Sequence, residues 1–417
     1  MTSLKKKRFA ITGATGLLGS NLLFEIIKRH LNDLDMVEII ILGRGKNNLV
    51  IEQRIRELLT EEGLSYLGVG NEFFNDEKEL FGGIIKCMNL DLGREDLGLS
   101  QEDLYKLKAA PIDIFFHVAA LTDFRSTPKV IDSLRKTNVL GTEKVLRLVS
   151  SLKIRQFCYV GSAYSCGDRK GNIRPDFINL KQNFRNPYEA TKLEAELLVR
   201  FFSDETGVPC KIFRTSTICG RLIESDIGLV NKFDVFYAWA AFFLRAKMKN
   251  MGSGTDLFGK PAQMNARILY SMQSGLNIVP ADYAAKAMYE ICSQDNGTSS
   301  YHLVNEHETP HSVYVPIMLE TLNICGITTV QFMPTDMNRL EELYYKTVGK
   351  IYTPYVASES MLFDTTELKR ILGSSGISCP EVDSKNFTAL MQYAKSKNFG
   401  IHKSIRMEDK VLEMEAG

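Results

Sequence analysis

The sequence predicts an α/β fold, in which a doubly wound parallel sheet is followed by a smaller, mostly helical C-terminal lobe. In the first two-thirds of the chain, short β-rich runs alternate with segments of helical apolar spacing, the pattern of a parallel sheet covered by helices. The strand-like runs are continuously apolar rather than alternating, so both faces of the sheet are expected to be buried. After about residue 220 this alternation loosens.

Six apolar runs predict the strands of the central sheet. In chain order they are Phe9–Thr12, Val37–Leu42, Ile84–Leu90, Ile112–His117, Phe157–Val160 and Lys211–Arg214. Helical spacing fills the intervals, at Leu17–Leu31, near Val130–Leu152 and at Pro187–Phe202. The last of these begins with proline, which is favoured in the first turn of a helix.

The C-terminal part predicts further helices and one short strand. The predicted elements are a helix of nearly all-round apolar surface at Phe233–Met248, a helix at Ala281–Cys292, a strand at Tyr301–Val304, and helices near 312–324, 336–348 and 384–396. We therefore expect a dinucleotide-binding unit at residues 1–220 and a substrate-binding lobe at 221–417, with residues near 277–305 returning to the first unit. No low-complexity linker separates the two parts.

The composition excludes several classes of protein. The 417 residues include 51 Lys and Arg against 50 Asp and Glu, so an extended nucleic-acid-binding surface is not expected. The longest apolar stretch, Val235–Leu244, is about half of the ~20 residues that span a bilayer, so no transmembrane segment is expected. The eight cysteines contain no C-x-x-C pair, which favours free thiols in a reducing compartment. A soluble, cytoplasmic protein is predicted.

A glycine-rich segment, TGATGLLG, lies between the first predicted strand and the first predicted helix. Gly13 permits a tight turn, Gly16 lets the backbone approach a pyrophosphate, and Gly19 allows the helix to pack closely on the strand. The free N–H groups at the helix start then face the phosphates. This setting predicts a Rossmann-type dinucleotide site. Its candidate cofactor-binding residues are Thr12, Gly13, Thr15, Gly16, Leu17 and Gly19.

The end of the second strand indicates which dinucleotide binds. NAD-selective sites usually have Asp or Glu at this place, but here Leu42 and Gly43 are followed by Arg44, with Arg54 in the next predicted helix. A guanidinium pairs with a 2′-phosphate and stacks on adenine, which favours NADP(H) over NAD(H). The alternative is that both arginines are solvated surface charges.

Two more strand ends contribute candidate cofactor contacts. Asp91, followed by Leu92, is a candidate acceptor for the adenine amino group, the alternative being a carboxylate that caps its own loop. Ala119, in the segment HVAA, is small enough for a cofactor to lie close to the backbone. His117 in the same segment has no partner at metal-ligand spacing, and no metal site is expected.

The segment YEATK places Tyr188 and Lys192 four residues apart, on one face of a helix. A nearby ammonium favours the phenolate and so lowers the tyrosine pKa from its usual value of about 10, which makes the phenol a usable proton donor. Ser162 ends the fifth strand and can polarise a carbonyl oxygen together with Tyr188. Ser162, Tyr188 and Lys192 are therefore the predicted catalytic residues, and Tyr188 and Lys192 are also expected to contact the cofactor.

Together, TGATGLLG, HVAA, NVLGT, GSAYSCG and YEATK resemble the extended branch of the short-chain dehydrogenase/reductase superfamily over roughly residues 8–220. This resemblance implies that Asn138, in NVLGT, supports the active site. Arg44, Arg54, the Asp91–Leu92 turn and the segments NIVPADY and YHLVN are similar to the NADPH-dependent thioester reductase and fatty acyl-CoA reductase group. One departure is Thr215, where the group more often has proline after the arginine.

The resemblance implies an NADPH-dependent reductase that acts on an acyl thioester, held on coenzyme A or on a carrier protein that arrives in trans, giving aldehyde or alcohol. Two alternatives of the same fold stay open: an NADP-dependent ketone, aldehyde or hydroxyl oxidoreductase, and a nucleotide-sugar epimerase or dehydratase. A non-catalytic NADP sensor is disfavoured, because it does not need all three catalytic residues. Acyl chain, homodimer formation and the role of the C-terminal lobe are left open.

Overall fold

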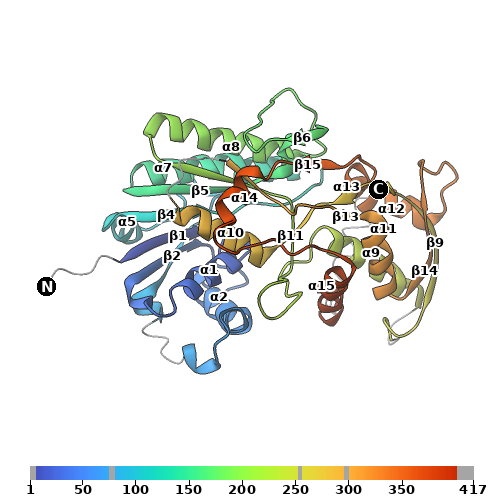
Figure 1. The fold of residues 1–417 in the computed structure, drawn as a ribbon, viewed down its shortest axis with the longest axis horizontal. Coiled ribbons are helices and arrows are strands. Elements are labelled where there is room, and N and C mark those ends of the chain that lie inside the picture. The colour runs from blue at the N-terminus through green and yellow to red at the C-terminus, as the bar shows by residue number, and fades with distance from the viewer. Residues whose placement is uncertain (1–5, 75–79, 252–255, 295–299, 402–417) are drawn as a thin grey trace. The chain divides into compact units, whose positions relative to one another are not determined.

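The computed structural model describes residues 6–74, 80–251, 256–294 and 300–401 (Figure 1). By their internal contacts these residues form two compact units. The first unit contains the chain up to Asp226, Asn277–Glu308 and Glu359–Glu381, and the second contains Ile227–Leu276, Thr309–Ser358 and the chain from Val382 onward. The chain therefore returns to the first unit twice. No pattern in the sequence predicts the second return.

The first unit is built on a seven-stranded sheet whose neighbouring strands are all parallel. Its strands, in spatial order, are β12 (Ser300–Leu303), β7 (Cys210–Thr215), β5 (Ile154–Ser162), β4 (Ile112–His117), β1 (Lys7–Thr12), β2 (Val37–Gly43) and β3 (Ile85–Asn89). The strand order reverses at β1, which pairs with both β2 and β4. In open α/β sheets, ligands bind at the carboxyl ends of the strands at this reversal.

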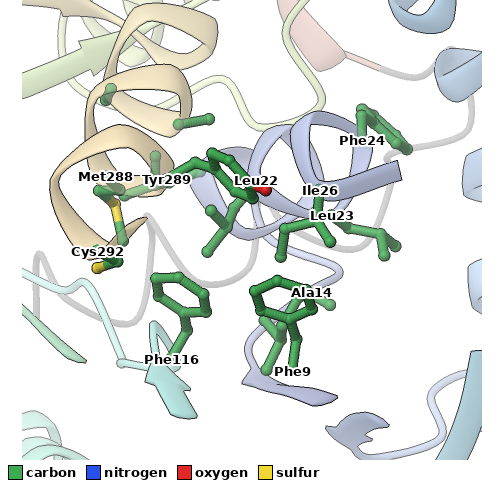
Figure 2. Packing of buried hydrophobic residues seen from close by; sticks show 14 of the residues in the cluster. Phe9, Ala14, Leu22, Leu23, Phe24, Ile26, Phe116, Met288, Tyr289 and Cys292 are labelled. Carbon is green, nitrogen blue, oxygen red and sulfur yellow. The ribbon is translucent and has the colours of Figure 1, made fainter. Parts of the chain in front are cut away.

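Helices cover both faces of the sheet, which confirms the predicted fold class. They are α1 (Leu17–Arg29), α2 (Ile51–Leu58), α3 (Leu64–Leu67), α5 (Gln101–Lys108), α6 (Pro128–Leu134), α7 (Gly141–Ser150), α8 (Pro187–Thr206), α10 (Ala281–Ser293) and α14 (Thr366–Leu372). Phe9 of β1 packs in one apolar cluster with α1 and α10, and its neighbour Ala10 packs in another with α7 and α8. Figure 2 shows the first cluster, in which Phe9 and Phe116 face the side chains of the two helices.

The second unit is mostly helical. Its helices are α9 (Phe236–Met251), α11 (His311–Thr321), α12 (Arg339–Lys346), α13 (Val348–Val356) and α15 (Ser384–Ser396). Its core contains an aromatic cluster in which the ring of Trp239 lies 6.3 Å from the rings of Tyr314 and Tyr344. Among the helices that the structure describes, none is both long and apolar enough to cross a bilayer.

The structure corrects several of the predicted elements. The helix expected near 312–324 ends at Thr321, because Asn323 has a left-handed backbone conformation with φ of 52°, and strand β14 (Ile324–Val330) follows. Strand β14 pairs in parallel with β9 (Ala262–Leu269), and neither strand is predicted from the sequence. The helix expected near 336–348 is α12, and a further helix that the sequence does not predict, α13, follows it.

Four short strands in the first unit and two in the second are also absent from the sequence prediction. They pair as β6 (Gly171–Ile173) with β15 (Met361–Phe363), β8 (Thr217–Cys219) with β11 (Ile278–Pro280), and β10 (Gly275–Leu276) with β13 (Thr309–Pro310). Runs of two or three residues carry too little periodicity to be recognised without their partners.

Candidate active site

The glycine-rich segment forms a tight loop between β1 and α1, and two of its glycines are required by their neighbours. Gly13 has φ of +78°, and a Cβ atom there would lie 2.6 Å from the backbone nitrogen of Ala119. At Gly19 a Cβ atom would lie 2.1 Å from the carbonyl oxygen of Gly13. Any side chain at either position would therefore displace backbone, so the loop depends on glycine here.

Gly16 differs from these two glycines, because the space beside it is open. A Cβ atom there would meet only the carbonyl oxygen of Gly13, at 3.4 Å, and the residue is exposed. Gly16 is the N-cap of α1, with extended backbone and no side-chain capping hydrogen bond. Thr15 and Leu17 beside it are half-buried. The N–H groups at this helix start suit a phosphate, so the loop fits a dinucleotide pyrophosphate.

The carboxyl ends of β2 and β3 carry the candidate residues for the adenosine end of a cofactor. Arg44 follows β2 and is exposed, and the half-buried Arg54 donates a hydrogen bond of 2.7 Å to the Arg44 carbonyl oxygen. Burial, and then the positive charge of Arg44, lowers the pKa of Arg54. Within the described residues, neither guanidinium forms an ion pair with a carboxylate. The charge of Glu57 acts on Arg54 without forming an ion pair with it, so both guanidinium groups can still contact an added phosphate group.

Asp91 lies at the neighbouring strand end, since Gly43 of β2 pairs with Asn89 of β3. Its Oδ1 accepts a hydrogen bond of 2.9 Å from the Gly93 backbone, so the carboxylate caps its own turn. The structure thus contains the loop-capping interaction that the sequence left as an alternative to adenine contact. Leu92 is buried and lies against Gly141, where a Cβ atom would approach Leu92 Cβ to 2.9 Å.

The predicted catalytic residues lie at the end of β5 and in the first turns of α8. Helix α8 begins after Asn186, whose side chain accepts a hydrogen bond from the Glu189 backbone, and Pro187 occupies the first turn. The Lys192 ammonium donates a 2.6 Å hydrogen bond to the carbonyl oxygen of Val160 in β5. This contact ties the Tyr188 and Lys192 face of α8 to the strand that ends in Ser162.

The surroundings of these three side chains differ. Lys192 is only 2% exposed, and burial lowers its pKa to about 7, opposed by the charge of Glu196. Ser162 is buried, and its hydroxyl oxygen accepts a hydrogen bond of 3.2 Å from the Tyr164 backbone, which leaves its proton for another acceptor. Tyr188 is half-buried, with its ring edge-on to Phe124 at 5.3 Å.

Asn138 connects the loop after β4 with α8. Its side-chain oxygen accepts a hydrogen bond from the Leu121 backbone at 2.8 Å, and its amide donates to the Leu121 carbonyl at 3.0 Å and to the Thr191 hydroxyl at 3.3 Å. It lies in a π-helical segment, Arg135–Leu140, which joins α6 to α7 within the helix expected near Val130–Leu152. Such widened turns are frequent at functional sites.

Two residues beside the site were not recognised from the sequence. Glu196, one helical turn after Lys192, is fully buried and forms two hydrogen bonds, of 2.8 and 2.9 Å, with the equally buried Arg214 of β7. The i, i+4 spacing of Lys192 and Glu196 was the available signal. The second is His117, whose imidazole is fully buried in hydrogen bonds to Thr12 and Thr142.

The sequence of this chain is similar to a family model and to several characterised proteins. A family model described as "Male sterility protein" matches residues 11–288, more than half of the chain. A linear gramicidin synthase of Brevibacillus parabrevis is 24% identical over 400 residues, which cover 92% of this chain and 7% of that protein. Fatty acyl-CoA reductase 2 of Homo sapiens is 30% identical over 163 residues, 38% of this chain and 28% of that protein. The chain thus spans less than a third of either relative.

Solved structures share the fold. The terminal R domain from the myxalamid PKS-NRPS biosynthetic pathway superposes with a TM-score of 0.69 at 24% identity, covering 96% of this chain and 93% of that one. UDP-glucuronic acid 4-epimerase from Bacillus cereus in complex with NAD superposes with a TM-score of 0.59 at 13% identity, covering 93% and 99%. With the family match over residues 11–288, the chain belongs to the Male sterility protein family, a group of extended short-chain dehydrogenase/reductases that use a nicotinamide cofactor.

Proposed function

We propose that the chain reduces acyl thioesters with NADPH, giving an aldehyde and a free thiol. The observation that carries this proposal is the hydrogen bond between the Lys192 ammonium and the Val160 carbonyl. It holds the face of α8 that bears Tyr188 and Lys192 against the strand that ends in Ser162, so a hydroxyl, a phenol and a cation are available at one strand end. This set suits the reduction of a carbonyl group.

A bound nicotinamide supplies the hydride, which goes to the carbonyl carbon of the substrate. Ser162 and Tyr188 donate hydrogen bonds to the carbonyl oxygen while negative charge develops on it. Tyr188 then transfers its proton to that oxygen, and the Lys192 ammonium favours the phenolate that remains. The resulting hemithioacetal releases the thiol and leaves the aldehyde. Reduction of the aldehyde to the alcohol would need a second NADPH in place of NADP+ and a Tyr188 that has regained its proton.

NADPH is proposed as the cofactor because Arg44 and Arg54 gather two cations at the end of β2. A 2′-phosphate would form the ion pair that neither guanidinium forms with a carboxylate of the described residues. The thioester is proposed to be held on coenzyme A or on a carrier protein. The fatty acyl-CoA reductase relative supports the first source, and the likeness to a thiolation-reductase di-domain of an archaeal non-ribosomal peptide synthetase supports the second.

The function is tested by following NADPH oxidation by absorbance with a panel of acyl-CoAs, acyl carriers, aldehydes, ketones and UDP-sugars. Consumption with thioesters is expected, with NADPH preferred over NADH. Arg44→Ala is expected to lower kcat/KM for NADPH more than kcat/KM for NADH, so that the preference for NADPH falls. If NADPH is consumed with ketones and not with thioesters, the chain would instead be an NADP-dependent ketone oxidoreductase. Conversion of a UDP-sugar without net cofactor consumption would favour an epimerase, and no consumption with any carbonyl compound would refute the proposal.

The proposed roles predict a separation of turnover from binding. Tyr188→Phe removes the transferable proton and keeps the ring that packs against Phe124, so turnover is expected to fall by a factor of about 10² to 10⁴. NADPH affinity, measured by fluorescence titration, is expected to stay within about threefold of the unmodified protein. A loss of affinity as large as the loss of turnover would contradict the assigned role.

A further inference from the structure

We infer that His117 is a positioning residue that couples the cofactor loop to the catalytic helix through a single chain of hydrogen bonds. The inference rests on the proposed function and extends it to a residue that touches neither substrate nor cofactor. His117 ends β4, between the strand that carries the glycine loop and the strand that carries Ser162. Its imidazole is 1% exposed.

Five groups form this chain of hydrogen bonds. The Ala119 backbone N–H donates to Thr12 Oγ1 at 3.3 Å, and Thr12 Oγ1 lies 2.8 Å from His117 Nδ1. On the other side of the ring, His117 Nε2 lies 3.1 Å from Thr142 Oγ1, and the Thr142 hydroxyl donates to the Asn138 carbonyl oxygen at 2.6 Å. The chain thus runs from the loop after β4 to the π-helical segment that holds Asn138.

The direction of every hydrogen bond in this chain follows from its last link. A carbonyl oxygen only accepts, so the one hydroxyl proton of Thr142 is used on Asn138, and Thr142 Oγ1 must accept from His117 Nε2. The neutral ring is therefore protonated at Nε2, and its Nδ1 accepts the hydroxyl proton of Thr12. Burial, followed by the charge of Lys192, lowers the pKa of His117 to about 3, so the ring stays neutral at physiological pH.

The two ends of the chain lie at the two functions of the site. At one end, the Ala119 nitrogen is the atom against which Gly13 is packed, so its position sets the shape of the phosphate loop. At the other end, Asn138 donates to the Thr191 hydroxyl, and that hydroxyl donates to the Tyr188 carbonyl at 3.0 Å. A shift of the loop on cofactor binding is thus transmitted, through groups that are all paired, to the turn of α8 that carries the phenol.

An apolar residue would satisfy the packing of β4 at a lower cost, because a buried imidazole must have both nitrogens paired. Phe115, two residues earlier on the same face of β4, packs in that way: it is fully buried in an apolar cluster. His117 differs from an apolar residue because its imidazole accepts a hydrogen bond at Nδ1 and donates one at Nε2. No apolar side chain can do either.

The test is a double-mutant cycle on the two hydroxyls on either side of the ring. Thr142→Val removes the hydroxyl at nearly constant volume, and Thr142→Ser keeps it as the matched control. Thr12→Val is the second single variant of the cycle. NADPH affinity is measured by fluorescence titration and kcat by thioester-dependent NADPH oxidation, with melting temperatures to confirm folding. Thr142→Val is expected to weaken NADPH binding and to lower kcat by about tenfold, and Thr142→Ser to remain near the unmodified protein.

The coupling itself is read from the double variant. Because Thr12 and Thr142 lie on opposite sides of the imidazole, independent structural roles would make their effects on NADPH affinity multiply. We expect instead that the double Val variant loses less than the product by about threefold or more. The same cycle in a His117→Phe background is expected to be multiplicative.

Multiplicative effects with His117 present, or an unchanged NADPH affinity in Thr142→Val, would overturn the inference. The affinity cycle needs no acyl substrate, so this outcome is distinguishable from failure of the proposed function. Binding with coupling but without thioester reduction would refute the function alone, and absence of NADPH binding in the unmodified protein would refute both.

Discussion

Burial of Lys192 lowers the pKa of its ammonium group, so the charge of this residue changes near neutral pH. Its ammonium donates to the Val160 carbonyl and lies 4.4 Å from the centre of the Tyr159 ring. Burial lowers its pKa to about 7 from a usual value near 10.5. The protonated form, which the proposed mechanism requires, is therefore the main form only below about pH 7 in the cofactor-free protein.

The pKa of Lys192 predicts a pH dependence of catalysis. Since kcat/KM for NADPH reports groups of the free enzyme, it is expected to fall as the pH rises through about 7, where Lys192 loses its proton. Lys192→Arg keeps a positive charge over this range, so its weaker activity is expected to lack the decline. A profile that is flat to pH 9 in the unmodified protein, or the same decline in Lys192→Arg, would contradict the assignment.

For Arg44, Arg54 and Asp91, residue type suggests a possible ligand, and the contacts show which groups of each side chain are already in use. The two arginines are close together and unpaired with carboxylates in the described part of the chain, as a phosphate site requires. Asp91 instead uses one carboxylate oxygen in its own turn. The sequence offered an alternative for each, solvated surface charges for the arginines and a loop cap for Asp91, and the structure contains the second.

At the scale of an element, the loop between β1 and α1 contains three glycines, and the physical reason for glycine is not the same at each position. Gly13 and Gly19 leave no room for a Cβ atom, because backbone atoms lie 2.6 and 2.1 Å from where it would be. Gly16 faces open space. The first two glycines therefore serve the packing of the loop, and Gly16 is the one proposed to let a ligand approach the backbone.

This difference predicts that alanine lowers stability at one position of the loop and cofactor affinity at another. Gly19→Ala is expected to lower the melting temperature, because the added methyl group collides with the Gly13 carbonyl. Gly16→Ala is expected to leave the melting temperature within a few degrees but to weaken NADPH binding by about tenfold or more, because the methyl group occupies the phosphate side of the loop. Calorimetry and fluorescence titration of both variants check this. Equal affinities for NADPH in Gly16→Ala and the unmodified protein would exclude a pyrophosphate at this loop.

At the scale of the whole molecule, both units contain histidines held neutral by burial. Burial lowers the pKa of His117 and His302 to about 3 and that of His311 to about 4, against about 6.5 in an unfolded chain. Between pH 6.5 and 4 the unfolded chain binds protons that the native protein excludes. The free energy of unfolding is therefore expected to fall as the pH falls, by up to about 1.4 kcal/mol per pH unit for each histidine.

Melting temperatures between pH 7.5 and 4.5 check this expectation. His302→Phe removes one of the three groups, in a position where the ring is already buried against Phe363, and is expected to melt with a weaker dependence on pH. The comparison needs no activity measurement. A melting temperature that is independent of pH from 7 to 5, or an unchanged slope in His302→Phe, would show that these rings are not held neutral.

The strands of the sheet, the glycine loop and the helix of Tyr188 and Lys192 were predictable because their signals are local. A buried strand is apolar along its own length, and a strand–loop–helix motif occupies fewer than about thirty consecutive residues. The π-helical segment at Arg135–Leu140, the end of α11 at Thr321 and the pairing of β9 with β14 were not predictable in this way. After α11, Asn323 donates hydrogen bonds to the carbonyl oxygens of Phe258 and Gly259, and β14 pairs with β9, so both features depend on partners far along the chain. Periodicity carries no information about such partners.

By itself, the sequence of this protein predicted the strands of its central sheet, the glycine-rich loop after the first of them, and the candidates Ser162, Tyr188, Lys192, Arg44 and Arg54. Only the tertiary structure decided what their neighbours do. It paired the Lys192 ammonium with β5, brought the Arg54 guanidinium to the Arg44 carbonyl, engaged Asp91 in its own turn and gave His117 a partner on each side. The physical reason is that residue type and spacing are written along the chain. The hydrogen bonds and burial that set a pKa or a direction of donation arise between residues as much as 105 positions apart.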